Sequence, residues 1–420
     1  MVPTLRWRIS LLVAAAIAIS YFDRQTLPIA VKAIQIEIPI SNTQFSQLQA
    51  AFLIAYAVMY AGGGKLTDAL GTRKAFALIM AWWSVACASH GLASAFGMLA
   101  VSRFLLGMGE GGGFPAATKV VAKWFPVLER STAMGIINAG TSVGAVFAPP
   151  MIAFVILALN WRWVFYLSGA IGLLWTAWWL RAYFPPASHP RLGSEERARI
   201  AGPAESRATS GPNISWLGLL RFPQVWGLVF AKFLSDAAWY FYLFWLPKYL
   251  YDVRQFDTKQ VGYYAWIPYA AAGIGSVCGG WFSSRMIRAG RSLDFSRKFA
   301  LGASAAAMPW IFLVTQSPVQ VAIVLFSLAF AGQQSWSTLV MILPADIFPL
   351  QSVGSVAGLV GFGGAMGGVV FGLVVGYLLD HGFGYGLVFG MVSTFHVLAF
   401  CVILATVRVV RPVAAAPGRS

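Results

Sequence analysis

Charged residues are scarce in this sequence. Asp, Glu, Lys and Arg make up only 10% of its 420 residues, whereas 58% are hydrophobic and the mean hydropathy is +0.70. A soluble domain needs a polar surface, so this composition excludes one and predicts a polytopic membrane protein. Windows of about 20 apolar residues, each long enough to cross a hydrocarbon core of about 30 Å, recur along the chain. They predict twelve membrane-spanning helices, at 9–34, 46–64, 75–95, 97–122, 132–157, 163–183, 224–250, 260–284, 298–315, 318–344, 354–379 and 385–407.

Cysteine is also rare, and several catalytic motifs are missing. The three cysteines fall in predicted helices and show no pairing or metal-ligand spacing, so we expect neither a disulfide framework nor a metal site. The sequence contains no G-x-x-x-x-G-K-[ST] loop for ATP and no H-E-x-x-H pair for zinc. We therefore expect no enzyme activity and no cofactor.

Acidic residues are few as well, which leaves a formal net charge of +16. Such a charge would suit nucleic acid, but most of the Lys and Arg residues fall in alternate loops, on the same side as both termini. The positive-inside rule then places both termini in the cytoplasm. We interpret the basic excess as orientation and contact with the lipid bilayer, and expect no nucleic-acid partner.

The chain divides into two halves that resemble each other. A stretch rich in Pro, Gly, Ser and charge separates them and predicts an N-terminal six-helix bundle at 1–184, a cytoplasmic linker at 185–215 and a C-terminal six-helix bundle at 216–420. Parallel repeats of this kind enclose a central cavity in transporters. Glycines also let helices approach closely, so plain packing is the alternative for each one. The repeat is Phe125-Pro126, Gly135, Gly140 and Gly144, which recur 223 positions later as Phe348-Pro349, Gly358, Gly363 and Gly367.

Charged residues of both signs lie inside apolar stretches of the first half, at Asp23, Arg24, Arg103 and Glu110. An ionisable side chain at the bilayer centre costs about 2.5 to 3.5 kcal/mol, so both signs together predict a polar cavity for a charged solute. Arg103 and Glu110 are seven positions apart, about 10.5 Å and two helical turns, and therefore share one face. A buried structural ion-pair network is the alternative.

The second half carries different chemistry at the corresponding positions. The offset of the repeat maps Glu110 onto Gln333 and Arg103 onto Phe326. We therefore expect hydrogen bonds and aromatic surface there, from Gln333, Gln334, Ser335, Trp336 and Ser337. Lys232 and Asp236 are spaced i, i+4 on one helix, so they either neutralise each other or contact the solute.

The loop from Gly64 to Lys74, between the second and third spans, reads G-K-L-T-D-A-L-G-T-R-K. It resembles the G-x-L-x-D-x-x-G-x-[RK]-[RK] signature of the major facilitator superfamily. The resemblance implies two six-helix bundles that work by alternating access, with Asp68 and Arg73 biasing the opening of the cytoplasmic side. In the second half Ser284 stands where the acidic residue would be, so we expect a weaker latch there.

A narrower resemblance concerns the anion:cation symporter branch of that superfamily. Tyr21-Phe22-Asp23-Arg24 resembles its N-Y-x-D-R pattern, with Ser20 in place of the Asn, and the segment from Arg103 to Pro115 resembles its fourth helix. Segments 138–141, 241–249 and 334–337 are similar to bacterial hexuronate and related sugar-acid transporters. The resemblance implies that hydroxyl groups of the solute are bound by Tyr21, Tyr56, Asn138 and Thr141.

The four buried charges suggest distinct roles. We predict that Arg24 binds the carboxylate of the substrate, because a guanidinium stays charged and its planar fork matches a carboxylate. Asp23 and Glu110 are the candidates for proton coupling. Arg103 is predicted to be the charge partner of Glu110 or to act toward the extracellular side.

These features predict a multi-pass transporter of the bacterial inner membrane. We expect a symporter that imports a small anion with a carboxylate, a hexuronate or related sugar acid, driven by the proton gradient. An exchanger of organic anions, or a symporter of an aldonate, an aldarate or an aromatic acid, is the alternative. One chain supplies both bundles, so we expect a functional monomer.

Overall fold

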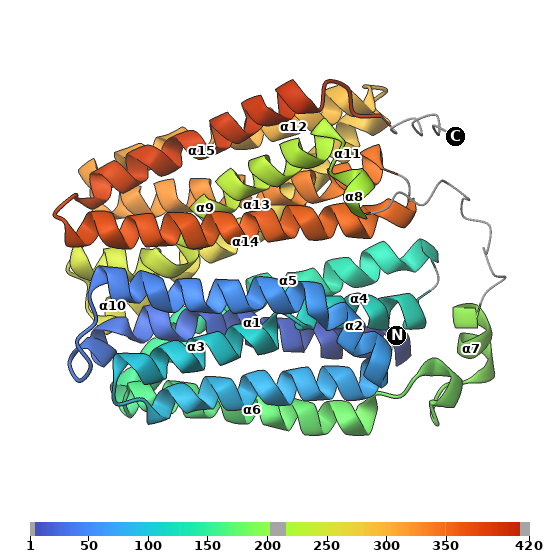
Figure 1. Ribbon diagram of the computed structural model, residues 1–420, viewed down its shortest axis with the longest axis horizontal. Coiled ribbons are helices and arrows are strands. Elements are labelled where there is room, and N and C mark those ends of the chain that lie inside the picture. Colours follow the sequence, from blue (N-terminus) through green and yellow to red (C-terminus); the bar gives the residue numbers. More distant parts are fainter. Residues whose placement is uncertain (1–4, 126, 202–215, 349, 412–420) are drawn as a thin grey trace. The chain divides into compact units, whose positions relative to one another are not determined.

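The computed structural model describes residues 5–125, 127–201, 216–348 and 350–411, and these residues fold almost entirely into helices (Figure 1). The expected all-α fold is confirmed. The α-helices are α1 (Leu5–Gln35), α2 (Asn42–Ser89), α3 (Phe96–Glu110), α4 (Gly113–Trp124), α5 (Val127–Ala158), α6 (Trp161–Ala182), α7 (Ser194–Ala201), α8 (Trp216–Leu219), α9 (Pro223–Asp252), α10 (Thr258–Tyr264), α11 (Trp266–Arg288), α12 (Leu293–Ala306), α13 (Val319–Ile347), α14 (Leu350–Asp380) and α15 (Tyr385–Thr406). Short 3-10 helices occupy His90–Leu92, Pro186–Ser188 and Pro309–Gln316.

Within the described ranges, eight helical segments are long and apolar enough to cross a membrane. They are Leu5–Gln35, Ala69–Leu92, Ala133–Ala158, Trp161–Ala182, Leu293–Gln316, Val319–Pro344, Ser355–Asp380 and Tyr385–Thr406. The remaining predicted spans also lie on helices, at 46–64, 97–122, 224–250 and 260–284. The total of twelve spans and the side of each terminus stay predictions.

Two helices differ from the predicted spans at positions where glycines occur. The second and third predicted spans join in α2, which is kinked at Gly71, where φ is 74° and ψ is 154°. Only glycine adopts this backbone conformation without steric cost, which explains a glycine at this position of the loop motif. The fourth predicted span breaks into α3 and α4 at Gly111 and Gly112.

The described chain forms two compact units. Unit 1 comprises the described residues up to 201 together with residues 244–266, and unit 2 comprises residues 216–243 together with those from 267 onward. The helix α9 therefore begins in unit 2 and ends in unit 1. Residues 244–266 belong to the predicted C-terminal bundle but group with unit 1, and the division into two six-helix bundles stays a prediction.

Two glycines from each copy of the sequence repeat make the same packing contact in both units. In unit 1 they lie on α5 against α1, and in unit 2 they lie on α14 against α9. A β-carbon at any of these glycines would meet a backbone carbonyl oxygen, so only glycine permits this approach. The contacted residues are four positions apart in each unit, which makes the repeat structural as well as sequential. The pairs are Gly140 with Ala14, Gly144 with Ala18, Gly363 with Val229, and Gly367 with Phe233.

Replacing Gly144 with Val is expected to destabilise unit 1 by at least about 1 to 3 kcal/mol, because the new side chain is forced against the Ala18 carbonyl. Thermal unfolding of the purified protein in detergent measures the effect. Gly135→Ala on the same helix is the matched control, since a β-carbon there meets no atom within 4 Å. A Gly144→Val protein that melts at the wild-type temperature would contradict the close approach.

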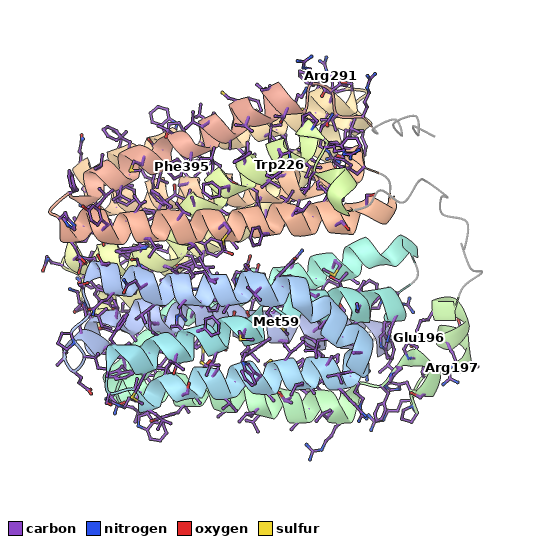
Figure 2. All side chains as sticks on the ribbon, in the orientation of Figure 1. Met59, Glu196, Arg197, Trp226, Arg291 and Phe395 are labelled. Atoms are coloured by element: carbon purple, nitrogen blue, oxygen red, sulfur yellow. The ribbon has the colours of Figure 1, made fainter. Side chains whose placement is uncertain are left out.

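The start of α1 is held by the short helix α7. The Glu196 carboxylate accepts backbone N–H bonds from Leu5 at 3.3 Å and Arg6 at 3.2 Å, and pairs with the Arg6 guanidinium at 3.2 Å. Figure 2 labels Glu196 and its neighbour Arg197 on α7. An anionic group at a helix N-terminus is stabilising, because it meets the unpaired N–H groups of the first turn. Part of the predicted linker is thus fixed to unit 1.

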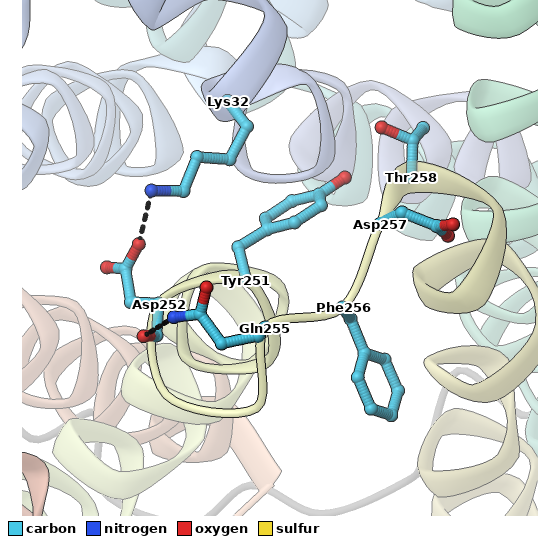
Figure 3. Close-up of a pocket in the computed structure, with 7 residues that line it drawn as sticks. All are labelled: Lys32, Tyr251, Asp252, Gln255, Phe256, Asp257 and Thr258. Atoms are coloured by element: carbon cyan, nitrogen blue, oxygen red, sulfur yellow. Dashed lines mark hydrogen bonds and ion pairs between the residues drawn. The ribbon is translucent and has the colours of Figure 1, made fainter.

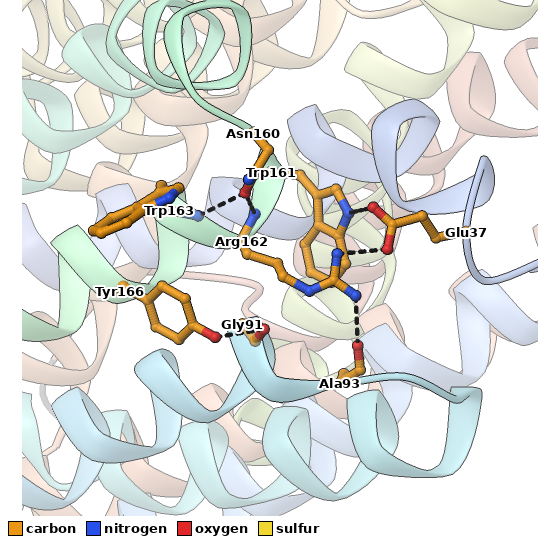
Figure 4. A network of polar contacts seen from close by, with 8 residues as sticks. All are labelled: Glu37, Gly91, Ala93, Asn160, Trp161, Arg162, Trp163 and Tyr166. Carbon is orange, nitrogen blue, oxygen red and sulfur yellow. Dashed lines mark hydrogen bonds and ion pairs between the residues drawn. The ribbon is translucent and has the colours of Figure 1, made fainter.

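A polar network joins the end of α1 to the start of α6 (Figure 4). The Glu37 carboxylate accepts hydrogen bonds from the Arg162 guanidinium and, at 2.9 Å, from the Trp161 indole N–H. Arg162 also donates to the Ala93 carbonyl at 3.3 Å. The hydrogen bond from Arg162, followed by that from Trp161, lowers the pKa of Glu37 below its ordinary value.

The lowered pKa makes the stabilising effect of Glu37 depend on pH. The contribution is present above the unfolded-state pKa of about 4.3 and is lost as the pH falls through the lower folded-state pKa. We expect Glu37→Gln to lower the melting temperature slightly at pH 7 and to match the wild type near pH 3. Melting curves at both pH values test this, with the exposed Glu195→Gln as control. An equal difference at both pH values would contradict the charge-based contribution.

Candidate functional site

A buried ion pair lies at the centre of unit 1. The Arg24 Nε on α1 donates to Glu110 Oε2 on α3 at 2.8 Å, and both side chains are almost fully buried. Ser20, one helical turn before Arg24, donates its hydroxyl to the same carboxylate oxygen at 2.7 Å. Ser20 is the position that departs from the Asn of the symporter pattern. Two charge-assisted hydrogen bonds therefore hold Glu110 against α1.

Aromatic rings surround the Arg24 guanidinium. Its Cζ lies 4.5 Å from the ring centroid of Tyr21, 4.7 Å from that of Tyr56 and 5.5 Å from that of Phe52. Cation–π contacts of this kind contribute about 0.5 to 2 kcal/mol each when water is excluded. The structure thus brings together Arg24, Tyr21 and Tyr56, three of the residues predicted for the substrate.

Arg103 has a different partner from the one predicted. Its side chain is fully buried and donates to the Gln49 side-chain oxygen, and its Cζ lies 5.0 Å from the Phe52 ring centroid. Glu110 is paired with Arg24 instead. The sequence reasoning missed Gln49, although Gln49, Phe52 and Tyr56 follow the i, i+3, i+7 spacing of one helix face.

Asp23 faces a different helix from its neighbour Arg24. It is fully buried, and its Oδ1 accepts a hydrogen bond from the Ser168 hydroxyl on α6. Consecutive residues on a helix point about 100° apart, which explains the separation. Asp23 and Glu110 are thus buried carboxyl groups of unit 1 with separate partners. Ser168 was also missed, because a single hydroxyl in an apolar span is an ordinary feature.

The other predicted residues of unit 1 have different surroundings. Asn138 is exposed on α5, and Thr141 donates to the Asn138 backbone carbonyl at 2.7 Å. Arg73 donates to the Leu180 carbonyl near the end of α6, with its Cζ 4.1 Å from the Phe184 ring centroid. The side chain of Asp68 lies outside the described residues. The gating role of Asp68 and Arg73 stays a prediction.

Unit 2 contains a second buried charge pair. Lys232 Nζ on α9 lies 2.9 Å from Asp236 Oδ1, so the two residues form the ion pair that their i, i+4 spacing suggested. Lys232 Nζ also donates to the Ser337 hydroxyl on α13 at 2.7 Å. Gln333 Nε2 lies 3.4 Å from the same Asp236 oxygen, and His396 on α15 contacts the Gln333 side-chain oxygen. The repeat aligns Gln333 with Glu110 of the first half, and Gln333 belongs to a hydrogen-bonded network that contains the charged residues Lys232 and Asp236.

The remaining predicted residues of unit 2 have contrasting surroundings. Trp336 is fully buried, and its ring packs within the apolar core of the unit, 5.5 Å from the His396 ring centroid. Gln334 and Ser337 are half-buried on α13. Of the predicted set, Gln333 and Ser337 share a network with Lys232.

The second loop motif lies beside its own charge pair. Ser283 accepts a hydrogen bond from Arg297 at 3.0 Å, and Arg297 pairs with Asp346 at 2.8 Å. Arg297 thus connects the loop of the second motif to Asp346 of α13. The weaker latch expected from Ser284 stays a prediction.

A polar pocket in unit 1 is less suited to an anion (Figure 3). It is lined by Lys32 of α1 and by residues of segment 251–258, including Asp252 and Asp257. Lys32 pairs with Asp252 at 2.7 Å, and Lys248 pairs with the same carboxylate. The wall of this pocket has two carboxylates and one lysine, which disfavours binding of an anionic solute. The Arg24 cluster is therefore the better candidate for an anion site.

Long apolar helices, a repeated packing of glycines and buried charges of both signs define the class: a multi-pass membrane transporter. Residues 13–370 match the family model described as Major Facilitator Superfamily. The chain belongs to the major facilitator superfamily, which confirms the resemblance of its loop motif.

Known transporters are similar to this chain over most of its length. It is 33% identical over 362 residues to the hexuronate transporter of Escherichia coli K12, covering 85% of this chain and 84% of the relative. It is 34% identical over 279 residues to the galacturonate transporter of Dickeya chrysanthemi, covering 66% and 81%. It is 30% identical over 373 residues to a probable galactarate/D-glucarate transporter of Escherichia coli K12, covering 84% of each.

A solved structure shares the fold. The crystal structure of a bacterial homologue of the human lysosomal transporter Spinster, in an inward-facing and occupied conformation, superposes with a TM-score of 0.75. It is 17% identical in sequence and covers 97% of this chain and 98% of its own. This similarity supports the major facilitator fold.

Proposed function

We propose that this protein imports a hexuronate or related sugar-acid anion together with protons, by alternating access across the bacterial inner membrane. The observation that carries the proposal is the buried Arg24–Glu110 pair, with Ser20 beside it and Tyr21 and Tyr56 against the guanidinium. A positive charge with aromatic neighbours suits a carboxylate on a compact, hydroxylated solute. Both termini are proposed to be cytoplasmic, and one chain is the proposed functional unit.

The relatives support the choice of solute. Three of them are named for hexuronate, galacturonate and galactarate or glucarate, all of which are sugar acids. The shared chemical group of these solutes is a carboxylate on a polyhydroxylated carbon chain. In unit 1 the guanidinium of Arg24 has the charge and the planar shape that match this carboxylate.

The proposed coupling step exchanges one carboxylate for another at Arg24. When Glu110 takes up a proton, it loses its charge and its attraction to the guanidinium, so the solute carboxylate replaces it. When Glu110 gives up the proton, it competes for Arg24 again and displaces the solute. Asp23, held by Ser168, is the second proposed proton site. Solute and proton affinities are then linked by one coupling free energy.

Uptake into proteoliposomes tests the function. Labelled galacturonate, glucuronate, galactonate and galactarate are offered with and without an inwardly directed proton gradient. Accumulation of a sugar acid that requires the gradient, without any solute inside, supports import with protons. Uptake only when the lumen is preloaded with anion would support an exchanger, and no uptake of any sugar acid would exclude the proposal.

A further inference from the structure

An apolar groove of unit 2, between α11 and α12, plays no part in the steps proposed at Arg24. Its volume is about 340 Å³, and clefts that hold small ligands measure about 300 to 1,000 Å³. Gly275 and Gly279 of α11 pack directly on α13, where a β-carbon would meet Ala331 and Ser335. Most residues that line the groove are Gly or Ala, so helix backbones rather than long side chains form its floor.

The hydroxyl groups in the groove are paired with each other. Ser304 donates its hydroxyl to the Ala300 carbonyl at 2.9 Å, and the side-chain oxygens of Ser304 and Ser335 lie 2.7 Å apart. A hydroxyl has one hydrogen to donate, so Ser335 is the donor to Ser304. The floor of the groove therefore suits a hydrocarbon chain better than a polar solute.

Exposed aromatic rings lie at the end of the groove nearest the loop between α11 and α12. Trp281 of α11 lines the groove and is 54% exposed. The ring centroids of Phe282 on α11 and Phe299 on α12 are 6.1 Å apart, and Phe295 stacks on Phe299 at 5.5 Å. Tryptophan is enriched where the hydrocarbon of a bilayer meets the headgroups. This end of the groove thus has the composition of a membrane interface.

Three exposed arginines follow these rings in the sequence, at Arg285, Arg288 and Arg291. The Arg285 Cζ lies 5.5 Å from the ring centroid of Trp281, and the Arg291 Cζ lies 5.8 Å from that of Phe295. Figure 2 labels Arg291. Within the described ranges, none of the three guanidinium groups pairs with a carboxylate. Their charge is therefore available to an anion outside the protein.

We propose that this groove is a binding site for an anionic phospholipid of the bilayer. One acyl chain lies in the groove, Trp281 packs beside the glycerol region, and the phosphate meets the arginines. The order of the protein surface, from small residues through aromatic rings to guanidinium groups, matches the order of chemical groups along such a lipid. Arginine suits the phosphate because its planar fork donates two parallel hydrogen bonds, and basic pockets between membrane helices bind anionic headgroups.

Alkylation of two natural cysteines tests the site. Cys278 is exposed in the groove, whereas Cys401 on α15 is exposed outside it. The full-length protein, freed of lipid in detergent, is treated with N-ethylmaleimide, and mass spectrometry of its peptides gives the rate at each cysteine. At about ten times its Kd, phosphatidylglycerol should slow the reaction of Cys278 about 10-fold, because about a tenth of the sites stay open. We expect the rate at Cys401 to be unchanged, and phosphatidylcholine at the same concentration to protect neither.

The arginines are tested by the triple variant Arg285→Gln, Arg288→Gln, Arg291→Gln. It should need at least about 10-fold more phosphatidylglycerol for equal protection of Cys278, since each basic residue near a membrane contributes roughly fivefold in affinity for anionic lipid. The matched control removes the same charge at three exposed arginines outside the groove: Arg181→Gln, Arg191→Gln and Arg221→Gln.

The groove is tested by filling it. Ala303 lines the groove and is exposed, so Ala303→Phe occupies the place of the acyl chain without entering the core. Native mass spectrometry should show one phosphatidylglycerol fewer on this variant than on the wild type. Ala306→Phe, at an exposed position of α12 outside the groove, is the matched control and should keep the lipid.

Three results would overturn the proposal. The first is a wild-type Cys278 that reacts at the same rate with and without phosphatidylglycerol. The second is equal protection by phosphatidylcholine, because the site would then not select an anionic lipid. The third is protection of the arginine triple variant at the wild-type lipid concentration, because the guanidinium groups would then not bind the phosphate.

Discussion

Replacing Arg24 with Gln is expected to raise the KM for uptake of sugar acids by at least about 100-fold, so that uptake at ordinary substrate concentrations is lost. A charge-assisted hydrogen bond to a carboxylate contributes about 1.5 to 3 kcal/mol, and the guanidinium fork offers two. Initial rates of labelled galacturonate uptake, measured over a range of concentrations, give the change. Undiminished uptake by Arg24→Gln would remove Arg24 from the substrate site.

Two further variants separate charge from folding. Arg24→Lys keeps the positive charge but loses the planar fork, so we expect partial activity with a raised KM. Arg24→Gln alone leaves Glu110 buried without its guanidinium partner, which can cost about 3 to 5 kcal/mol. The double variant Arg24→Gln, Glu110→Gln removes both charges. It should melt closer to the wild-type temperature and still fail to transport.

Replacing Glu110 with Gln is expected to abolish accumulation driven by the proton gradient while preserving counterflow. The amide keeps the size of the carboxyl group and can still accept the hydrogen bonds from Ser20 and Arg24. It cannot take up or release a proton, so it no longer links solute binding to pH. Gradient-driven uptake and counterflow, measured on the same proteoliposomes, distinguish the two activities.

Asp23→Asn is the matched comparison for Glu110, since both carboxyl groups are buried and each accepts a serine hydroxyl. Loss of gradient-driven accumulation in both variants would identify two coupling sites. Wild-type accumulation in Glu110→Gln would instead show that this carboxyl group is only the structural partner of Arg24.

The charged residues of the site could be recognised from the sequence because their background is so apolar. Asp23, Arg24, Arg103 and Glu110 stand out in spans where a charge costs free energy. Which arginine pairs with Glu110 could not be predicted from the sequence. Arg24 and Arg103 both had a plausible route to Glu110, and the rotation of α1 and α3 about their axes, which the sequence does not specify, decides for Arg24.

Contacts between residues of one helix could be predicted from their spacing in the sequence, whereas contacts between helices could not. The i, i+4 rule found the Lys232–Asp236 pair, because both residues lie on one helix. The attachment of that pair to Gln333 and His396 depends on how α9, α13 and α15 pack, and no local pattern encodes it. The glycine repeat is an intermediate case. Its equal spacing in the two halves indicated that both copies make similar helix contacts, but it did not identify the residues contacted.

The ring of Phe52 has two guanidinium groups near it, that of Arg24 at 5.5 Å and that of Arg103 at 5.0 Å. An aromatic ring has negative potential over its face and positive potential at its edge, so it can attract a neighbouring cation without neutralising it. The ring of Phe52 therefore contributes to the electrostatic environment of both Arg24 and Arg103, although it carries no charge and does not titrate. Substitution of Phe52 would therefore change the surroundings of both guanidinium groups as well as the packing.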